Sequence, residues 1–338
     1  MHRWMVWLGR WSSGAFCSVM VSVFFAASTA QAVPIDLTDA TPAVSGVTTL
    51  HIEGIATLGS SYWADFEWNA NSNVFQVVAY GEEEEPPEGF VAIEPGSFIM
   101  GSPTDELGHG GDEVQHAVTL SQGFYLAEAE VTQAQWVAVM GSNPSFYKAP
   151  TYPQCDDCPV ENVTWYDAVD YCNALSDLEG LDRAYVVNGP GVNWDQSANG
   201  YRLPTESEWE YACRAGTTTA FYNGGITAVG CALDPVLDQI GWYCGNSASR
   251  THEVRQKQSN AWGLYDVSGN VYEWCWDWYG NYPGTVTDPV GPVSGAERIK
   301  RGGNWQAIVR GCRSAYRSDS APGARSRVDG LRAARTRP

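Results

Sequence analysis

The chain has 338 residues, a formal net charge of −19 at pH 7 and a hydrophobic content of 44%. A chain this acidic is poorly suited to nonspecific binding of nucleic acid, so we exclude that class of partner. The charge is unevenly placed, because residues 298–338 hold eleven Lys/Arg against Asp319 and Asp329, a local balance of +9. This basic segment could attract an acidic partner, but we favour arginines that pair with acidic residues inside the fold.

Residues 1–32 have the features of an export signal peptide. Arg3 and Arg10 supply positive charge, residues 15–27 form an apolar run, and Ala30-Gln31-Ala32 is a small-x-small cleavage site. The run is too short for a membrane anchor, although an uncleaved anchor is the alternative. We therefore predict an exported protein (periplasmic, cell-surface or secreted) with no membrane span after signal cleavage.

Residues 33–81 predict a small all-β module. Apolar residues recur with a period of two around Leu50 and Ile52 and again from Tyr62 to Trp68, and Phe75–Tyr80 indicates a further strand. Residues 82–89 follow as a Glu- and Pro-rich stretch without apolar side chains, which favours a solvated linker. The remaining residues, 90–338, are expected to form a second domain.

Three short helices are indicated in residues 90–338 by their capping signals. Thr132, Thr164 and Thr205 each stand before a segment with an apolar face, and each is followed three residues later by Gln or an acidic residue. Gly141 is expected to end the first helix. The rest of the region predicts short strands and long loops, hence an α+β domain.

Eight cysteines remain after signal cleavage, and in an oxidising compartment disulfides are the default. Cys155 and Cys158 predict a local loop disulfide, since no second pair at zinc-ligand spacing accompanies them. Cys231 and Cys244 are candidates for a second loop disulfide. The pairing of the other four stays open.

Six segments occur in the order found in the formylglycine-generating enzyme (sulfatase-modifying factor) family, which they resemble. They are Ile93–Ser102, Glu130–Thr132, Pro159–Trp165, Tyr201–Ala212, Gly263–Trp274 and Arg301–Trp305. The resemblance covers nearly all of residues 90–335. It implies that family's variant of the C-type-lectin-like fold.

The resemblance also implies where enzymatic chemistry would lie. Enzymes of this family oxidise a substrate cysteine to formylglycine with copper held by two cysteines, whose soft thiolates suit Cu(I). In this sequence the two positions are Ala307 and Cys312, and Asn304 replaces a serine near the active site. We therefore expect no copper. Cys312 is a catalytic candidate only if the chain is an enzyme, and a structural cysteine is the favoured alternative. Iron-dependent relatives use a separate helical domain, which is not predicted before residue 90.

A calcium ion is the cofactor that the resemblance implies most directly. The family's loop before its Trp-rich strand supplies side-chain and backbone oxygens, which correspond to Asp266, Gly269, Val271 and Glu273. Oxygen ligands suit a hard cation of this kind. The alternative is that Asp266 and Glu273 only satisfy backbone donors and arginines in a tight loop.

The C-terminal segment resembles variable proteins of diversity-generating retroelements, which share this fold. Arginines and glycines occupy framework positions there, while the residues between them follow no strand or helix period. In those proteins the replaceable side chains form a ligand-binding face on a fixed scaffold. The corresponding positions are Asn304, Trp305, Gln306, Ala307, Ile308, Gly311, Ser318, Asp319, Ser320, Ala321, Ser326, Val328 and Asp329. A fixed, non-diversified relative would have the same scaffold.

Three functions follow from these observations. We favour a protein that binds a protein or surface ligand through the C-terminal face. The alternative is a formylglycine-generating oxidase or a related enzyme that modifies a cysteine on exported proteins. The third is an accessory structural module that presents residues 33–81 to a partner.

Overall fold

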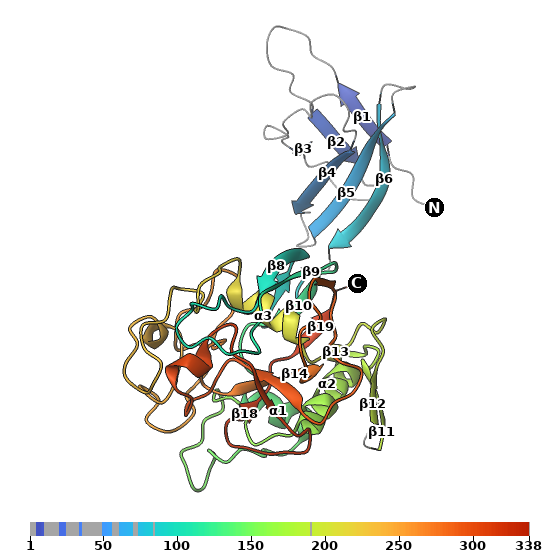
Figure 1. The fold of residues 1–338 in the computed structure, drawn as a ribbon. Helices are drawn as coiled ribbons and strands as arrows, with labels where there is room; N and C mark the ends of the chain where they lie inside the picture. The colour runs from blue at the N-terminus through green and yellow to red at the C-terminus, as the bar shows by residue number, and fades with distance from the viewer. Residues whose placement is uncertain are drawn as a thin grey trace. The chain divides into compact units, whose positions relative to one another are not determined.

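The computed structural model describes residues 85–189 and 191–337 with their side chains and, within residues 1–84, the backbone of six strands. The chain divides into two compact units, Met1–Glu85 and Pro86–Pro338 (Figure 1). The signal peptide prediction and residues 70–73 fall largely outside the described residues.

The first unit contains two three-stranded antiparallel sheets. Their strands are β1 (Met5–Gly9), β2 (Met20–Phe24) and β3 (Pro34–Ile35), and β4 (Thr49–Ile55), β5 (Ser61–Asn69) and β6 (Val74–Glu83). The strands expected from the period-two patterns are present as β4, β5 and β6. Because β6 continues to Glu83, the acidic stretch assigned to a linker begins within a strand.

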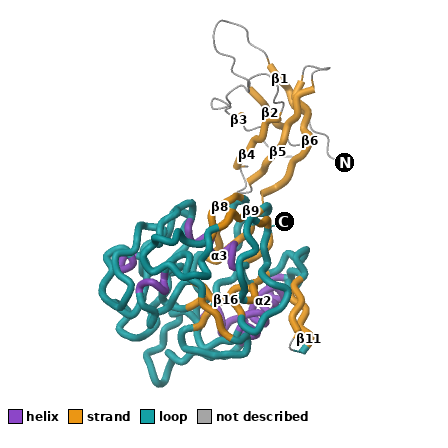
Figure 2. The backbone as a smooth tube through the Cα atoms, in the orientation of Figure 1, coloured by secondary structure: helices purple, strands orange, loops and turns teal. Residues whose placement is uncertain are grey.

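The second unit is α+β and rich in loops, as the sequence predicts (Figure 2). Its strands are β7 (Phe90–Ile93), β8 (Gly96–Met100), β9 (His116–Leu120), β10 (Phe124–Ala127), β11 (Tyr185–Asn188), β12 (Gly191–Trp194), β13 (Tyr201–Arg202), β14 (Tyr272–Trp278), β15 (Val286–Thr287), β16 (Arg298–Arg301), β17 (Ser318–Ser320), β18 (Asp329–Gly330) and β19 (Ala334–Thr336). Two short 3₁₀ turns, Leu237–Gln239 and Val309–Cys312, lie in its loops.

The C-terminal segment is woven into the sheets of this unit. In the sheet ordered β17-β16-β14-β18, β14 pairs antiparallel with β16 and parallel with β18. The last strand, β19, lies between β13 and β10 in a second sheet that ends in β7. Residues 298–336 therefore supply four strands, so this segment is part of the scaffold as well as a candidate for binding.

All three predicted helices are confirmed. Helices α1 (Gln133–Met140), α2 (Trp165–Glu179) and α3 (Glu206–Arg214) begin after Thr132, Thr164 and Thr205, and each of these threonines forms a complete capping box. Such a box satisfies two backbone N–H groups that the first helical turn leaves without partners. Gly141 ends α1 in the left-handed conformation, as expected.

Two of the cysteine predictions are confirmed and one is wrong. Cys155 and Cys158 form a disulfide, as do Cys231 and Cys244. The default expectation of disulfides for the other four cysteines fails, because Cys172, Cys213, Cys275 and Cys312 are free and buried. Cys172 and Cys213 lie on the core faces of α2 and α3, where a thiol acts as a small apolar side chain.

Candidate functional site

Buried arginines fix the C-terminal segment to acidic residues elsewhere in the second unit. Arg301 forms ion pairs with Glu206 and Glu210 of α3, and Arg317 reaches Glu206 at 2.7 Å. Burial alone would raise the pKa of Glu210, but Arg214 and Arg301 hold it below its usual value. The expectation that the basic residues act inside the fold is therefore confirmed for these side chains.

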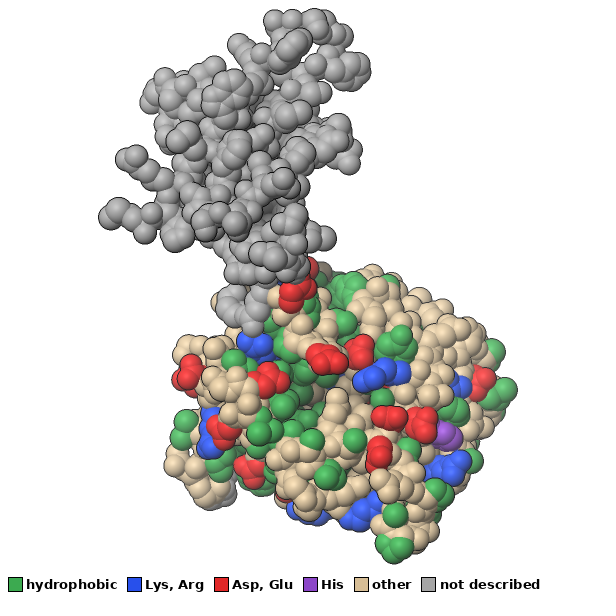
Figure 3. Space-filling view, turned by 180° about the vertical axis from the view of Figure 1, so that it is seen from behind, with side chains coloured by type: hydrophobic (Ala, Val, Ile, Leu, Met, Phe, Trp, Pro, Cys, Tyr) green, Lys and Arg blue, Asp and Glu red, His purple; other side chains and the backbone are tan. Residues whose placement is uncertain are grey.

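Arg313 and Arg332 continue this framework. Arg313 pairs with Glu106 at 2.7 Å and Glu113 at 2.6 Å, and Arg332 pairs with Glu273 of β14 at 2.7 Å. Both guanidinium groups are fully buried. Most of the excess positive charge of residues 298–338 is thus paired with acidic residues inside the fold. On the face shown in Figure 3, acidic and basic side chains lie interspersed. We call Arg301, Arg313, Arg317 and Arg332 the arginine framework.

The positions between the framework arginines are more accessible. Gln306, Ile308 and Ala321 are exposed, and Ile308 keeps 38% of its surface in contact with solvent. The half-buried members of the predicted set are Ala307, Ser318, Asp319, Ser320, Ser326 and Val328. We call these nine residues the candidate face.

Four residues of the predicted set are buried instead and act as supports. Asn304 accepts a hydrogen bond from the Gln306 N–H at 2.8 Å, and Trp305 donates from Nε1 to the Arg327 carbonyl at 3.0 Å. Gly311 lies within a 3₁₀ turn, and Asp329 forms a buried ion pair with Lys300 at 2.9 Å. Because these four residues are buried, we correct their assignment from ligand contacts to supports of the candidate face.

A second loop lies beside the candidate face, and sequence reasoning missed it. The rings of Phe146, Tyr147 and Tyr152 contact one another, and Tyr147 meets Trp305 edge-on with centroids 5.6 Å apart. Arg327 lies over both Phe146 and Trp305. The clustering of three aromatic residues among prolines in residues 144–153 was the available signal.

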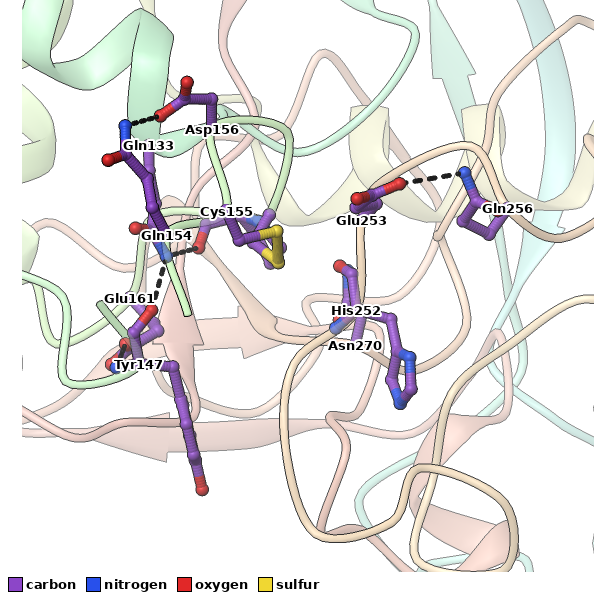
Figure 4. Close-up of a disulfide and its surroundings, with 12 residues drawn as sticks. Gln133, Tyr147, Gln154, Cys155, Asp156, Glu161, His252, Glu253, Gln256 and Asn270 are labelled. Atoms are coloured by element: carbon purple, nitrogen blue, oxygen red, sulfur yellow. Dashed lines mark hydrogen bonds between the residues drawn. A yellow bond between two sulfur atoms is a disulfide. The ribbon is translucent and has the colours of Figure 1, made fainter. Parts of the chain in front are cut away.

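Glu161 lies beneath this loop and is fully buried. Its Oε1 accepts the backbone N–H of Tyr147 at 2.8 Å, and Figure 4 shows the Tyr147 ring extending away from that carboxylate. Oε2 has no hydrogen-bond partner. Burial therefore raises the pKa of Glu161 to about 7, against hydrogen bonds from the Tyr147 and Phe146 backbone that lower it.

Cys312 is poorly placed for chemistry. It is fully buried, and burial raises the pKa of its thiol to about 12. Gly303 packs so closely that a Cβ atom on it would lie 2.5 Å from the Cys312 sulfur. Ala307 occupies the position of the first cysteine of the family's copper pair, so this donor set does not fit that copper site.

The four predicted calcium ligands lie on the loop that leads into β14. Asp266 accepts the Arg255 N–H through Oδ2 at 2.7 Å, while its buried Oδ1 has no hydrogen-bond partner. Glu273 is engaged by Arg332 and by Trp209 Nε1. The described residues contain no cluster of three or more His, Cys, Asp or Glu arranged to hold a metal ion, so a site here depends on backbone oxygens of Gly269 and Val271.

The electrostatics of this region nevertheless fit a cation. Burial raises the pKa of Asp266 to about 6. The pKa of Glu130 is raised well above its usual value by burial and by the charges of Asp266 and Glu273. Since Arg332 is the main countercharge to three buried carboxylates, a divalent cation beside the free Oδ1 of Asp266 would offset the remainder.

A separate cavity of about 170 Å³ lies near the N-terminus of α3. Trp194, Arg202, Glu208 and Asp288 are among its lining residues, and no residue of the candidate face is. Arg202 and Glu208 are joined by a salt bridge at 2.7 Å. The candidate face is therefore not part of this cavity. In the described residues, no helix combines the length and apolar character needed to cross a membrane.

Comparison with known proteins gives a family and several relatives. The model of the sulfatase-modifying factor enzyme 1-like domain matches residues 75–337. The chaperone protein LppX of Paenibacillus barcinonensis is 36% identical over 59% of this chain and 75% of its own length. The formylglycine-generating enzyme of Streptomyces coelicolor is 30% identical over 73% of this chain and 88% of its own.

A solved structure is similar as well. Variable protein 1 of Treponema denticola superposes with a TM-score of 0.66 and 30% identity, covering 86% of this chain and 99% of that one. The resemblance of the C-terminal segment to variable proteins is thereby confirmed, as is the fold expected from the sequence.

Proposed function

The chain belongs to the sulfatase-modifying factor enzyme 1-like family, and we propose that it is an exported protein that binds a protein or surface ligand through the candidate face. The family's variant of the C-type-lectin-like fold serves as its scaffold.

The observation that carries the proposal is the division of roles within residues 301–332. The arginine framework is buried and ion-paired, whereas the candidate face between those arginines is exposed or half-buried. Side chains presented in this way can be replaced without disturbing the core, which is the property of loops that carry binding on a rigid scaffold.

Three further observations support export and a binding role. The two disulfides are typical of an oxidising compartment outside the cytoplasm. The loss of one copper cysteine and the burial of the other argue against the oxidase chemistry of the family. The similarity to a variable protein favours ligand binding over that chemistry.

The test uses selection from a phage-displayed library of random short peptides. The native protein should enrich a set of sequences. A variant in which residues 306–308 and 318–321 are each scrambled should melt at an unchanged temperature but capture none of them. A milder variant, Gln306→Ser with Ile308→Ser, serves if scrambling impairs folding. Undiminished capture by a folded variant, or no enrichment by the native protein, would refute the proposal.

The alternative is formylglycine generation, favoured by the similarity to the Streptomyces coelicolor enzyme. It is tested by mass spectrometry of a Cys-x-Pro-x-Arg peptide incubated with the protein, copper and oxygen. Conversion of the thiol to an aldehyde, lost in Cys312→Ser, would establish the enzyme and overturn the binding assignment.

The proposal includes a structural calcium ion. Asp266 and Glu273 would contribute carboxylate oxygens, and Gly269 and Val271 backbone carbonyls. The ion would neutralise buried negative charge and hold the loop before β14, whose residue Asn270 accepts the Trp305 N–H through its carbonyl at 2.7 Å. Calcium would in this way support the candidate face without touching the ligand.

A further inference from the structure

Three basic residues of the C-terminal segment are exposed: Arg310, Arg325 and Arg327. Arg325 pairs with Asp167 at 2.9 Å. In the part of the chain with described side chains, the guanidinium groups of Arg310 and Arg327 make no hydrogen bond or ion pair. Unlike the arginine framework, these two side chains are exposed and have no acidic partner within the described residues.

Arg327 differs from Arg310 because it is held in place by two rings. Its guanidinium carbon lies 5.3 Å from the Trp305 ring centre and 5.6 Å from that of Phe146. An arginine stacked on aromatic rings has fewer conformations to lose on binding, and its planar N–H groups remain free to donate at their edge.

Trp305, one of the two rings against Arg327, is held by contacts of its own. Trp305 is buried, donates from Nε1 to the Arg327 carbonyl and is met edge-on by Tyr147. Glu161, the nearby buried acid, directs Oε1 to the Tyr147 N–H and makes no ion pair with Arg327. Packing therefore positions the Arg327 guanidinium, whose charge interacts with that of Glu161 without a direct ion pair.

Phe146 supplies the apolar half of the surface. Its side chain is 45% exposed although it contacts Tyr147 and Tyr152. Aromatic residues and arginine are enriched at protein interfaces relative to the rest of the surface, so an exposed ring beside this arginine favours a protein partner. Trp305 joins this pair to Gln306, the first residue of the candidate face.

We infer that Arg327 and Phe146 form one end of the binding surface and receive, from a protein partner, a carboxylate side chain flanked by an apolar or aromatic residue. Arg327 would donate two parallel hydrogen bonds to the carboxylate, and Phe146 would cover the neighbouring side chain. This inference rests on the proposed function, because it names the chemistry of the ligand at the same face.

The experiment compares charge reversal at two neighbouring positions, Arg327→Glu and Arg325→Glu. Both variants change the net charge equally, but Arg325 is already paired with Asp167. The same peptide library is selected on the native protein and on each variant. We expect the native protein to select peptides with Asp or Glu beside an aromatic or aliphatic residue. Arg327→Glu should select peptides with Lys or Arg at the acidic position. Arg325→Glu should select the same acidic peptides as the native protein.

A titration of the best native peptide gives the magnitude. Because a hydrogen bond between charged groups would be lost, Arg327→Met should bind this peptide about tenfold to a hundredfold more weakly. Replacing the acidic residue of the peptide by its amide should weaken binding to the native protein by a similar factor. Arg325→Met should change the affinity by less than about threefold. Arg327→Met also replaces Arg327→Glu if the reversed charge impairs folding.

Each outcome decides the inference separately from the proposed function. Peptides without acidic residues, whose capture still depends on residues 306–308, would overturn the inference and leave the proposed function standing. If charge reversal at Arg325 and at Arg327 changed the acidic preference equally, the preference would come from general charge attraction, and the inference would be overturned. Failure of the native protein to enrich any peptide would refute both.

Discussion

Arg332 and Glu273 form a fully buried ion pair in which Arg332 donates from Nε to Oε2 at 2.9 Å and from Nη2 to Oε1 at 2.7 Å. Glu273 lies on β14, and Arg332 lies in the C-terminal segment, two residues before the start of β19. Trp209 of α3 adds a third hydrogen bond to the same carboxylate at 2.6 Å. One carboxylate therefore joins a helix, a central strand and the end of the chain.

Breaking this pair is expected to destabilise the fold strongly. In Glu273→Gln the buried guanidinium loses its ion-pair partner and keeps only its charge interactions with Glu130 and Asp266. Removing one partner of a buried pair costs about 3–5 kcal/mol. Urea unfolding of the second unit measures the effect. The exposed pair of Arg183 and Asp177 provides the control, since Asp177→Asn should cause a far smaller change. Similar losses for the two variants would contradict the framework role.

Sequence patterns predicted the elements whose signals are local. The three capping boxes need only residues three positions apart, and the disulfide between Cys155 and Cys158 is equally short in range. The motif order predicted the family. The candidate face was harder, because exposure depends on packing between distant segments.

The errors at the candidate face have one physical cause. Trp305 and Asp329 were assigned to ligand contacts, yet both are buried by partners far away in the sequence, such as Tyr147 and Lys300. The pairing of Phe146 with Arg327 was missed for the same reason, since 181 positions separate the two residues. The pairing of arginines inside the fold was foreseen, but not which acid each arginine meets.

The stability of the protein should depend on pH through Glu161. Its folded-state pKa of about 7 exceeds the ordinary value of 4.5 for a glutamate, so folding favours the protonated acid. The stabilising contribution is complete below pH 4.5 and is lost as the pH rises through 7, by at most about 1.4 kcal/mol per pH unit. Denaturation of the native protein and of Glu161→Gln across this range gives the difference. A difference that does not change with pH would show that Glu161 titrates normally.

Calcium should stabilise the second unit by mass action. A ligand that binds only the folded state at a hundred times its Kd adds about 2.7 kcal/mol, which calorimetry detects as a higher melting temperature. Asp266→Ala should abolish the increase, whereas Asp266→Asn keeps one oxygen ligand and should retain part of it. Equal melting temperatures in calcium and in chelator would remove the ion from the proposal.

The disulfide between Cys231 and Cys244 is expected to support the candidate face as well as the fold. The N–H of Cys244 donates to the Ala307 carbonyl at 3.0 Å, and the N–H of Val309 donates to the Gly230 carbonyl at 3.0 Å. Residues at the two ends of the disulfide loop therefore hold residues 307–309.

Replacing both cysteines of this pair by serine should destabilise the protein by about 3 kcal/mol, because the bond closes a loop with a sequence separation of 13. The Val309 amide should then exchange with solvent faster, since its acceptor, the Gly230 carbonyl, directly precedes Cys231. The disulfide between Cys155 and Cys158, which are three positions apart, closes a much smaller loop. Replacing these two cysteines by serine should leave the Val309 amide protected. Hydrogen exchange resolves the two cases. If Val309 stays equally protected in both variants, the loop does not support the face, and reduced peptide capture would need another cause.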